Sequence, residues 1–507
     1  MGDQNTPLTE ADARQMIRRC GFGIPAKDSK KFRVEELAQL TRGEAADLFV
    51  DFKPKGFKPK SSEARAAHDK WVKYMFKRKK NLALQEKIVL FLHDHFATNF
   101  TDLDARIDSE KTSVRVLAEQ NRTLRKNCLG SFKDLVKLIN VDVAMMWFLD
   151  TVFNKKFEPN ENYGRELLEL FTLGVKDLNG SENYLQEDVI QVSRAFSGWV
   201  DDAFKAGKSF LDPFEHDTTA EFPGRGDKEI FGVTHPTQGH QVGGFVSPQS
   251  FIVGGEAENE IDEVVEIIFQ HTDTDGENTV ARHLTFKLLE YFCYEGPDKA
   301  TVDAIIASSG FTTTWELKAL LREIFVHDIF FETGAAPGAS TKKSVRWPID
   351  YVLGTLRALR VQPKGKELQL QGGNFNDVVE LLQDMGQVVL EPPSVFGWDW
   401  EQAWISSVGL LARYEFVRDV TTSRDSKPFQ PEKLIDITLT TAADIVDAVT
   451  DQLGVTDQLT AAQRQALIDF VLAGESEPLD LFDVDFREEK LHGLYALVLQ
   501  SPAVVLY

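Results

Sequence analysis

The chain has 507 residues, 42% hydrophobic and 27% charged, which is an ordinary globular composition with ample material for a hydrophobic core. Its 79 acidic and 57 basic residues give a net charge of −22, which repels phosphate backbones and excludes nucleic acid as a general partner. No apolar run reaches the roughly 18 residues that a transmembrane helix needs.

The N-terminal sequence indicates where the protein is located, and the number and spacing of the cysteines indicate whether they form disulfides. No basic-then-apolar leader is visible at the N-terminus, so we expect a cytoplasmic protein unless a leader was removed. Cys20, Cys128 and Cys293 are an odd number and lie far apart in sequence. Buried free thiols are therefore expected rather than a disulfide framework.

In chain order, the first elements are short helices over 8–48, a surface loop over 51–62 and a charged helix over 63–80. Residues 82–96 are apolar around most of the helical circumference, which predicts a buried helix. This helix carries His93 and His95 at its C-terminal end. Residues two apart do not face the same way, so both imidazoles serve one site only if the helix ends or distorts there.

Further helices are predicted over 103–127, 132–141, 143–152 and 187–200. Between them, residues 159–174 read as a helix with both ends marked. Asn160 or Asn162 can cap its first N–H groups, and Gly174 can end it in a left-handed conformation.

This helix has two stripes, each at spacing i, i+3, i+4, i+7. The apolar stripe is Leu167, Leu170, Phe171 and Gly174. The polar stripe is Asn162, Arg165, Glu166 and Glu169. A column of an amide, a guanidinium and two carboxylates is either a solvated face or the lining of a polar cavity.

Residues 201–257 lack a helical period and are rich in Gly and Pro. We expect an irregular insertion with a short β-hairpin between Phe204 and Phe210. The insertion carries His216 and Asp217. A segment this long without regular structure is usually functional or mobile.

Helical periodicity returns over 261–270, 279–294, 314–331, 344–359, 375–389, 403–418, 442–453, 461–472 and 488–499. The fold class predicted from these patterns is mainly α: a multi-helix globular domain with a small β-hairpin and irregular insertion near 201–257. We expect residues 1–420 to form the helical core. Residues 421–507 are expected to be a C-terminal helical segment packed on it.

Several blocks together carry a family resemblance. They are NENYGRELLELFTLG at 160–174, RRCGFG at 18–23, HDHFAT at 93–98, EDVIQVSRAFSGW at 187–199, HD at 216–217, PPSVFGW at 392–398 and SP at 501–502. With these blocks the chain resembles the uncharacterised bacterial DUF1800 family from near residue 8 to the C-terminus. Relatives in that family are often exported, and they are often encoded beside DUF1501 proteins, which resemble sulfatase-type hydrolases.

The polar residues of these blocks predict a candidate site. Imidazoles and carboxylates are ligands for zinc, iron or manganese, and the expected metal ligands are His93, His95, His216 and Asp217. The expected catalytic residues are Arg165, Glu166, Glu169 and His216. A metal held in this way could activate water, so the first hypothesis is a metal-dependent or acid–base hydrolase.

Two other interpretations stay open. The same residues could be a structural network, paired with Arg165 and Arg194 inside a helical core. Alternatively, the protein could be a non-catalytic scaffold or the partner subunit of a DUF1501-type protein, as the resemblance permits. Under the enzyme and the network interpretations alike, a histidine of 93–95, a glutamate of 166–169 and His216 are expected to converge, because buried ionisable groups need partners.

Overall fold

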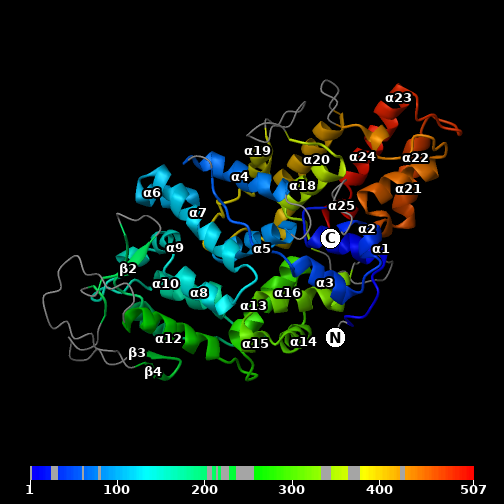
Figure 1. Ribbon diagram of the computed structural model, residues 1–507. Coiled ribbons are helices and arrows are strands. Elements are labelled where there is room, and N and C mark those ends of the chain that lie inside the picture. Colours follow the sequence, from blue (N-terminus) through cyan, green and yellow to red (C-terminus); the bar gives the residue numbers. More distant parts are fainter. Residues whose placement is uncertain are drawn as a thin grey trace.

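The computed structural model describes residues 3–23, 32–59, 62–77, 82–202, 208–212, 215–217, 228–235, 256–332, 344–363, 377–422 and 429–506. This part of the chain is mainly helical, with two small antiparallel sheets at one end (Figure 1). The predicted fold class is confirmed. Most of the predicted irregular insertion, including Phe204, lies outside the described residues.

The first half of the chain forms helices α1 (Glu10–Arg19), α2 (Val34–Leu37), α3 (Arg42–Val50), α4 (Ala64–Lys77), α5 (Leu82–His95), α6 (Phe100–Ile107), α7 (Glu110–Asn127), α8 (Phe132–Asn140), α9 (Val143–Phe148), α10 (Glu161–Glu166) and α11 (Gln186–Ala195). Most of their starts are marked by side-chain caps. Thr9 and Thr41, for example, each accept a hydrogen bond from the amide three residues on, within a capping box.

The second half forms helices α12 (Glu256–Gln270), α13 (Thr279–Phe292), α14 (Lys299–Ser309), α15 (Phe311–Thr314), α16 (Leu317–Val326), α17 (Asp328–Phe331), α18 (Pro348–Ala358), α19 (Val378–Asp384), α20 (Ser407–Thr422), α21 (Ala442–Leu453), α22 (Ala461–Leu472), α23 (Val484–Phe486), α24 (His492–Leu499) and α25 (Pro502–Val505). No described helix has both the length and the apolarity to cross a membrane.

The strands are short and lie at the same end of the molecule as α12 (Figure 1). Strand β1 (Trp199–Asp201) pairs antiparallel with β2 (Ser209–Leu211), with Trp199 opposite Leu211. Strand β3 (Lys228–Ile230) pairs antiparallel with β4 (Val233–His235). A hairpin was expected at this place, although the first predicted hairpin residue is not among those described.

Helix α5 lies at the centre of the helical assembly, as its apolar circumference predicted (Figure 1). All of its residues from 83 to 95 are buried. Apart from the histidines, three of them are acidic or basic, and two of these, Glu86 and Lys87, form ion pairs. Glu86 binds Arg125 of α7 at 2.6 Å, and Lys87 binds Asp350 of α18 at 2.6 Å. An unpaired charge at such a position would cost several kcal/mol, so these pairs fix which helices pack on α5.

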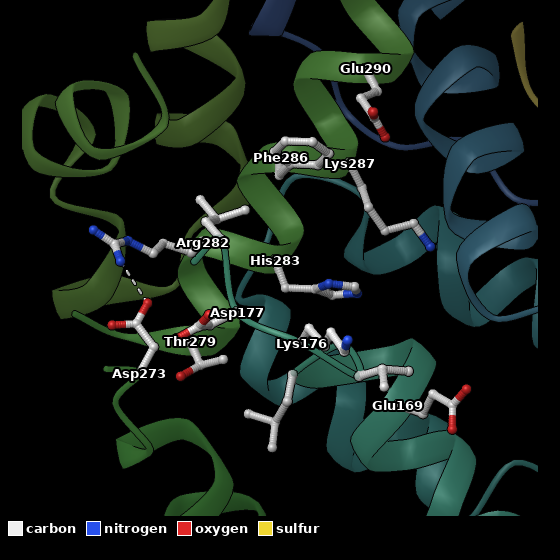
Figure 2. A pocket seen from close by; sticks show the side chains of 14 residues that line it. Glu169, Lys176, Asp177, Asp273, Thr279, Arg282, His283, Phe286, Lys287 and Glu290 are labelled. Carbon is white, nitrogen blue, oxygen red and sulfur yellow. Dashed lines mark hydrogen bonds and ion pairs between the residues drawn. The ribbon is translucent and has the colours of Figure 1, made fainter. Parts of the chain in front are cut away.

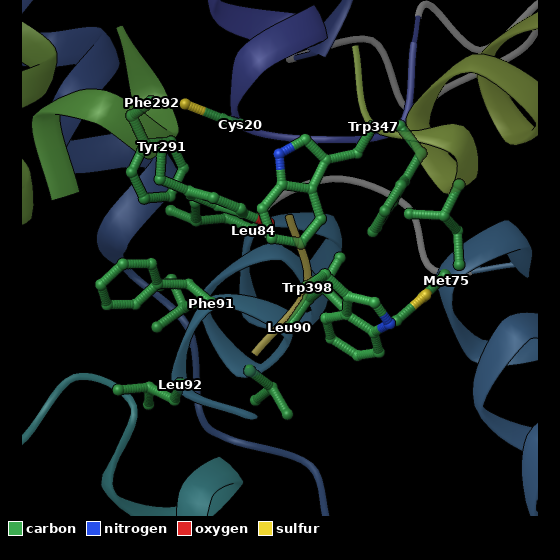
Figure 3. Packing of buried hydrophobic residues seen from close by; sticks show 14 of the residues in the cluster. Cys20, Met75, Leu84, Leu90, Phe91, Leu92, Tyr291, Phe292, Trp347 and Trp398 are labelled. Atoms are coloured by element: carbon green, nitrogen blue, oxygen red, sulfur yellow. The ribbon is translucent and has the colours of Figure 1, made fainter. Parts of the chain in front are cut away.

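The loop after α19 is attached to the end of α5 through Asp94. One carboxylate oxygen accepts a hydrogen bond from the Trp398 amide at 2.7 Å, and the other accepts one from the Trp400 indole at 3.0 Å. Trp347 and Trp398 lie over the buried face of α5 together with Tyr291 (Figure 3). This loop is therefore a packed part of the core.

The helix boundaries differ from the prediction in several places, of which two show their physical cause clearly. The expected helix over 103–127 is two helices, α6 and α7, because Asp108 adopts a left-handed conformation with φ of 54° and Ser109 caps the start of α7. Helix α14 was not predicted at all; Asp298 caps its start and Gly310 ends it.

The C-terminal helices contact the rest of the chain through specific hydrogen bonds. The Tyr351 hydroxyl on α18 donates to the Leu499 carbonyl of α24 at 3.0 Å. The Arg346 amide donates to the Val505 carbonyl at 2.9 Å, beside a bridge between Val345 and Leu506. The last turns of the chain therefore pack against α18 and the segment before it.

Gly397 provides a test of the loop attachment. Its φ is +86°, and a Cβ there would lie 2.8 Å from the Asp94 carbonyl oxygen and closer still to the Asp94 carboxylate. We expect Gly397→Ala to lower the free energy of unfolding in urea by about 3 kcal/mol, from backbone strain and overpacking together.

Gly180→Ala is the matched control. Gly180 has a φ of +90°, but a Cβ there would meet nothing within 4 Å. Gly180→Ala should lower the free energy of unfolding by only about 1 kcal/mol, because the substitution adds backbone strain but no steric overlap. Equal losses in the two variants would show that the contact with Asp94 contributes nothing.

Candidate functional site

The segment predicted as one helix over 159–174 has two parts. Asn160 caps α10, and its side chain accepts a hydrogen bond from the Asn162 amide at 2.9 Å. Residues Leu167–Thr172 then form a π-helical turn, with the Leu173 amide donating to the Leu168 carbonyl. Gly174 ends it with φ of +80°, as predicted. The uniform α-helix was wrong, and π-turns of this kind occur frequently at functional sites.

His95 is bonded to the end of this turn. Its Nε2–H donates to the Phe171 carbonyl at 3.0 Å, and its ring packs against Phe96 and Phe132. Burial holds the pKa of His95 well below its usual range, and the positive charge of Lys287 adds to the effect. The imidazole is therefore neutral and serves as a hydrogen-bond donor to the helix end.

His93 lies on a different side of α5. Its ring contacts Trp71 on α4 and Trp398, with ring centres 5.3 and 5.7 Å away. Burial lowers the pKa of His93 to about 3. Both imidazoles could serve one site only if α5 ended or distorted near them. Helix α5 stays regular through His95, so the two imidazoles have separate surroundings.

His216 and Asp217 belong to a separate buried network. The His216 ring binds the Ser197 carbonyl through Nδ1 at 2.8 Å and the Glu260 carboxylate through Nε2 at 2.7 Å. Lys228 binds the same carboxylate and also the Asp217 carbonyl. The Asp217 carboxylate accepts a hydrogen bond from Arg194 at 3.1 Å. These groups satisfy one another, as the structural-network interpretation expected for Arg194.

The expected metal ligands do not form a ligand set. Across the described ranges, no three His, Cys, Asp or Glu side chains are grouped in a way that could hold a metal ion. This applies to His93, His95, His216 and Asp217, all of which are described. The hydrogen bonds of His216 go to Ser197 and Glu260, and not to Glu166, Glu169 or His95. The residues present therefore do not fit the predicted metal centre.

The two glutamates of the polar stripe are close to each other but differ in surroundings. Glu166 is buried, and its Oε2 has no hydrogen-bond partner in the described chain. Burial, with the charge of Glu169 as the second cause, raises the pKa of Glu166 to about 7. Glu169 is half-buried and accepts a hydrogen bond from the Tyr184 hydroxyl at 2.8 Å. Arg165 instead bonds Glu161 and Gln186 near the surface.

Glu169 lines a cavity of about 330 Å³ between the π-turn and α13, which we call the signature cavity (Figure 2). Its other lining residues are Leu173, Gly174, Val175, Lys176, Asp177, Leu178, Asp273, Thr279, Arg282, His283, Phe286, Lys287 and Glu290.

One side of the signature cavity is closed by ion pairs. Arg282 binds Asp273 at 2.6 Å, Asp275 at 2.7 Å and Asp303 at 2.7 Å. Asp177 accepts hydrogen bonds from the amides of Asn179 and Ser181. The charged groups on this side have partners within the protein, so this side is structural.

Along the other side, Glu290, Lys287, His283 and Glu169 follow one another (Figure 2). The His283 Nε2–H donates to the Leu170 carbonyl of the π-turn at 3.2 Å, and burial lowers the pKa of His283 to about 3. Lys287 is half-buried. Burial lowers the pKa of its ammonium, while Asp94 and Glu290 act in the opposite direction. No hydrogen bond or ion pair joins the Lys287 ammonium to another described residue.

Sequence reasoning did not single out the α13 residues. His283, Lys287 and Glu290 are spaced i, i+4, i+7 on a helix whose Leu284, Leu288 and Phe292 are buried. Polar residues at helical spacing, the pattern that identified Asn162, Arg165, Glu166 and Glu169, therefore also occur within the predicted helix 279–294. Asp94 was also overlooked, although it lies between the two histidines that were considered.

Comparison with known families matches residues 8–506 to the family described as Protein of unknown function (DUF1800). No curated protein and no solved structure matches the chain.

The raised pKa of Glu166 predicts how stability depends on pH. Between about pH 4.5 and 7 the folded protein keeps a proton on Glu166 that the unfolded chain releases, so this residue makes stability fall as pH rises through that window. From pH 5 to 8, wild type should lose about 2 kcal/mol of unfolding free energy relative to Glu166→Gln in urea titrations. Glu182→Gln, at an exposed position in the following turn, should track wild type at both pH values.

Proposed function

Since this chain belongs to the DUF1800 family, whose function is unknown, we propose from its geometry that it is an acid–base enzyme of the hydrolase class, acting in the signature cavity. The observation that carries the proposal is a pair of carboxyl groups, Glu166 at the end of α10 and Glu169 on the π-turn. Glu169 lines the cavity, whereas Glu166 does not line it and has a pKa of about 7. Pairs of carboxyl groups in unequal environments are typical of acid–base sites.

Glu169 is the group that can reach a substrate. It lines the cavity and is oriented by the Tyr184 hydroxyl. In the proposed reaction its carboxylate takes a proton from a water molecule while the water oxygen bonds to the substrate. The bond between the substrate and its leaving group then breaks, and the Glu169 carboxyl delivers the proton to the leaving group. Glu166 lies outside the cavity wall and acts on Glu169 through its charge, so it is a positioning residue.

The surroundings suit this chemistry. The carbonyls of Leu170 and Phe171 at the end of the π-turn are bonded by His283 and His95, which holds the Glu169 backbone in place. Leu173 and Phe286 contribute apolar wall, and a cavity of about 330 Å³ falls in the range of small-molecule sites. A metal centre is not part of the proposal, because the expected ligands are not grouped among the described residues.

The test is hydrolysis of a panel of chromogenic esters, amides, phosphate esters and glycosides. We expect at least one class to be hydrolysed, and Glu169→Gln to lower kcat/KM for it by about 100-fold or more, the usual scale of a lost general base. Glu182→Gln should leave the rate unchanged, since this side chain is exposed and does not line the cavity. Hydrolysis that survives in Glu169→Gln would contradict the assignment of the base.

A second candidate function, as a scaffold or partner subunit of a DUF1501-type protein, is favoured by one surface. Val408, Leu411 and Tyr414 on α20 are 69%, 58% and 42% exposed at spacing i, i+3, i+6. Leu497 of α24 is 42% exposed, and Gln500 of the same segment bonds the Tyr414 carbonyl. Neighbouring apolar side chains left in solvent are typical of surfaces that bind another protein.

Leu411→Asp tests this second candidate. A carboxylate in the middle of the α20 surface should abolish copurification of a coexpressed DUF1501-type protein, because burying an unpaired charge in an interface is costly. Leu185→Asp is the matched control, at a residue 65% exposed on the segment before α11. Copurification unaffected by Leu411→Asp, or absent in wild type, would contradict the role of this surface.

A further inference from the structure

Lys287 is unusual among the cavity residues because its three N–H donors are unused. Arg282 on the same helix binds three aspartates, whereas no hydrogen bond or ion pair joins Lys287 to any residue in the described ranges. Its neighbours Asp94 and Glu290 use their own oxygens elsewhere. Asp94 accepts from Trp398 and Trp400, and Glu290 accepts from the Gly296 amide at 3.3 Å.

A second lysine lines the same cavity. Lys176 is exposed, and its ammonium likewise forms no hydrogen bond or ion pair within the part of the chain that the structure describes. The chain as a whole carries 79 acidic against 57 basic residues. In so acidic a protein, lysines that line a cavity and form no hydrogen bond or ion pair with a described residue call for an explanation.

We propose that the signature cavity binds an oxyanion group of its ligand, a carboxylate or a phosphate, through Lys287, with Lys176 adding to the attraction. The inference rests on the proposed function: it deepens it by naming the substrate class as small anionic compounds. A half-buried ammonium has already lost much of its hydration, so an incoming oxyanion restores hydrogen bonds that water supplies only in part.

The arrangement also gives the ligand an orientation. Lys287 and Glu169 lie at different positions along the same side of the cavity, with His283 between them (Figure 2). An anionic group held at Lys287 keeps its charge away from the Glu169 carboxylate, which would repel it. The neutral part of the ligand, with the bond to be hydrolysed, then lies at Glu169. Lys287 is thus a binding and specificity residue, and Glu169 remains the base.

The experiment measures binding without turnover. The melting temperature of the full chain is followed against inorganic phosphate and, separately, acetate, with chloride at matched ionic strength as the reference. We expect a rise in the melting temperature with phosphate or acetate beyond that with chloride, as mass action requires for a ligand of the folded state. The anion giving the larger rise identifies whether phosphate or carboxylate is preferred.

Variants assign the effect to the cavity. Lys287→Met should weaken the apparent affinity for the anion at least about tenfold, and Lys287→Arg should retain part of it, since a charged hydrogen bond is at stake. Lys299→Met is the matched control, because Lys299 already binds Asp275 and Asn179. Lys176→Met, at an exposed position that tolerates substitution, should weaken the affinity to a smaller extent and covers the case in which Lys287→Met fails to fold.

An anion effect absent from wild type, or unchanged in Lys287→Met and Lys176→Met, would overturn the inference. The hydrolase proposal can fail independently. Anion binding at Lys287 without hydrolysis of any substrate class would keep this site and remove the proposed reaction. Hydrolysis that depends on Glu169 but shows no preference for anionic substrates would keep the proposed reaction and remove the anion site.

Discussion

Helix α5 has no face in solvent, and the arrangement of its neighbours follows from that constraint. Each polar side chain on a fully buried helix needs a partner from another element. Glu86 forms an ion pair with Arg125 of α7, and Lys87 forms one with Asp350 of α18. Asp94 accepts hydrogen bonds from Trp398 and Trp400 in the loop after α19, and His95 donates one to Phe171 in the π-turn. Four contacts along one helix thus join segments that are up to about three hundred residues apart.

The sequence predicted much of this architecture because helices carry local signals. The apolar circumference of 82–96 predicted that this helix is buried, as it is. Asn160 and Gly174 were predicted to begin and end the helical segment 159–174, and they do so in the structure. The π-turn could not be predicted in the same way. It differs from an α-helix by a shift of one residue in the hydrogen-bond partner, and nothing in the local pattern of apolar residues records that shift.

The candidate site was only partly predictable, because its geometry depends on contacts between distant segments. Glu166 and Glu169 were identified from their helical spacing in the polar stripe. The pairing of His216 with Glu260, 44 residues later, has no local signal, and neither has the position of α13 opposite the π-turn. The expected metal ligands lie apart in the described structure for the same reason: residue types suited to ligation say nothing about which side of α5 each imidazole faces.

The buried imidazoles couple the stability of this fold to pH. His68, His93, His95 and His283 all have pKa values lowered chiefly by burial, to about 4 for His68 and about 3 for His93 and His283. Below about pH 6.5 the unfolded chain takes up protons at these rings and the folded chain does not, so these four imidazoles favour unfolding as pH falls. The buried carboxyl groups of Asp94 and Glu166, whose pKa values are raised to about 7, act in the opposite direction. His95 and His283, the two rings that hold the π-turn, are among the four imidazoles, so protons act on the cavity wall and on the core around α5 through the same side chains.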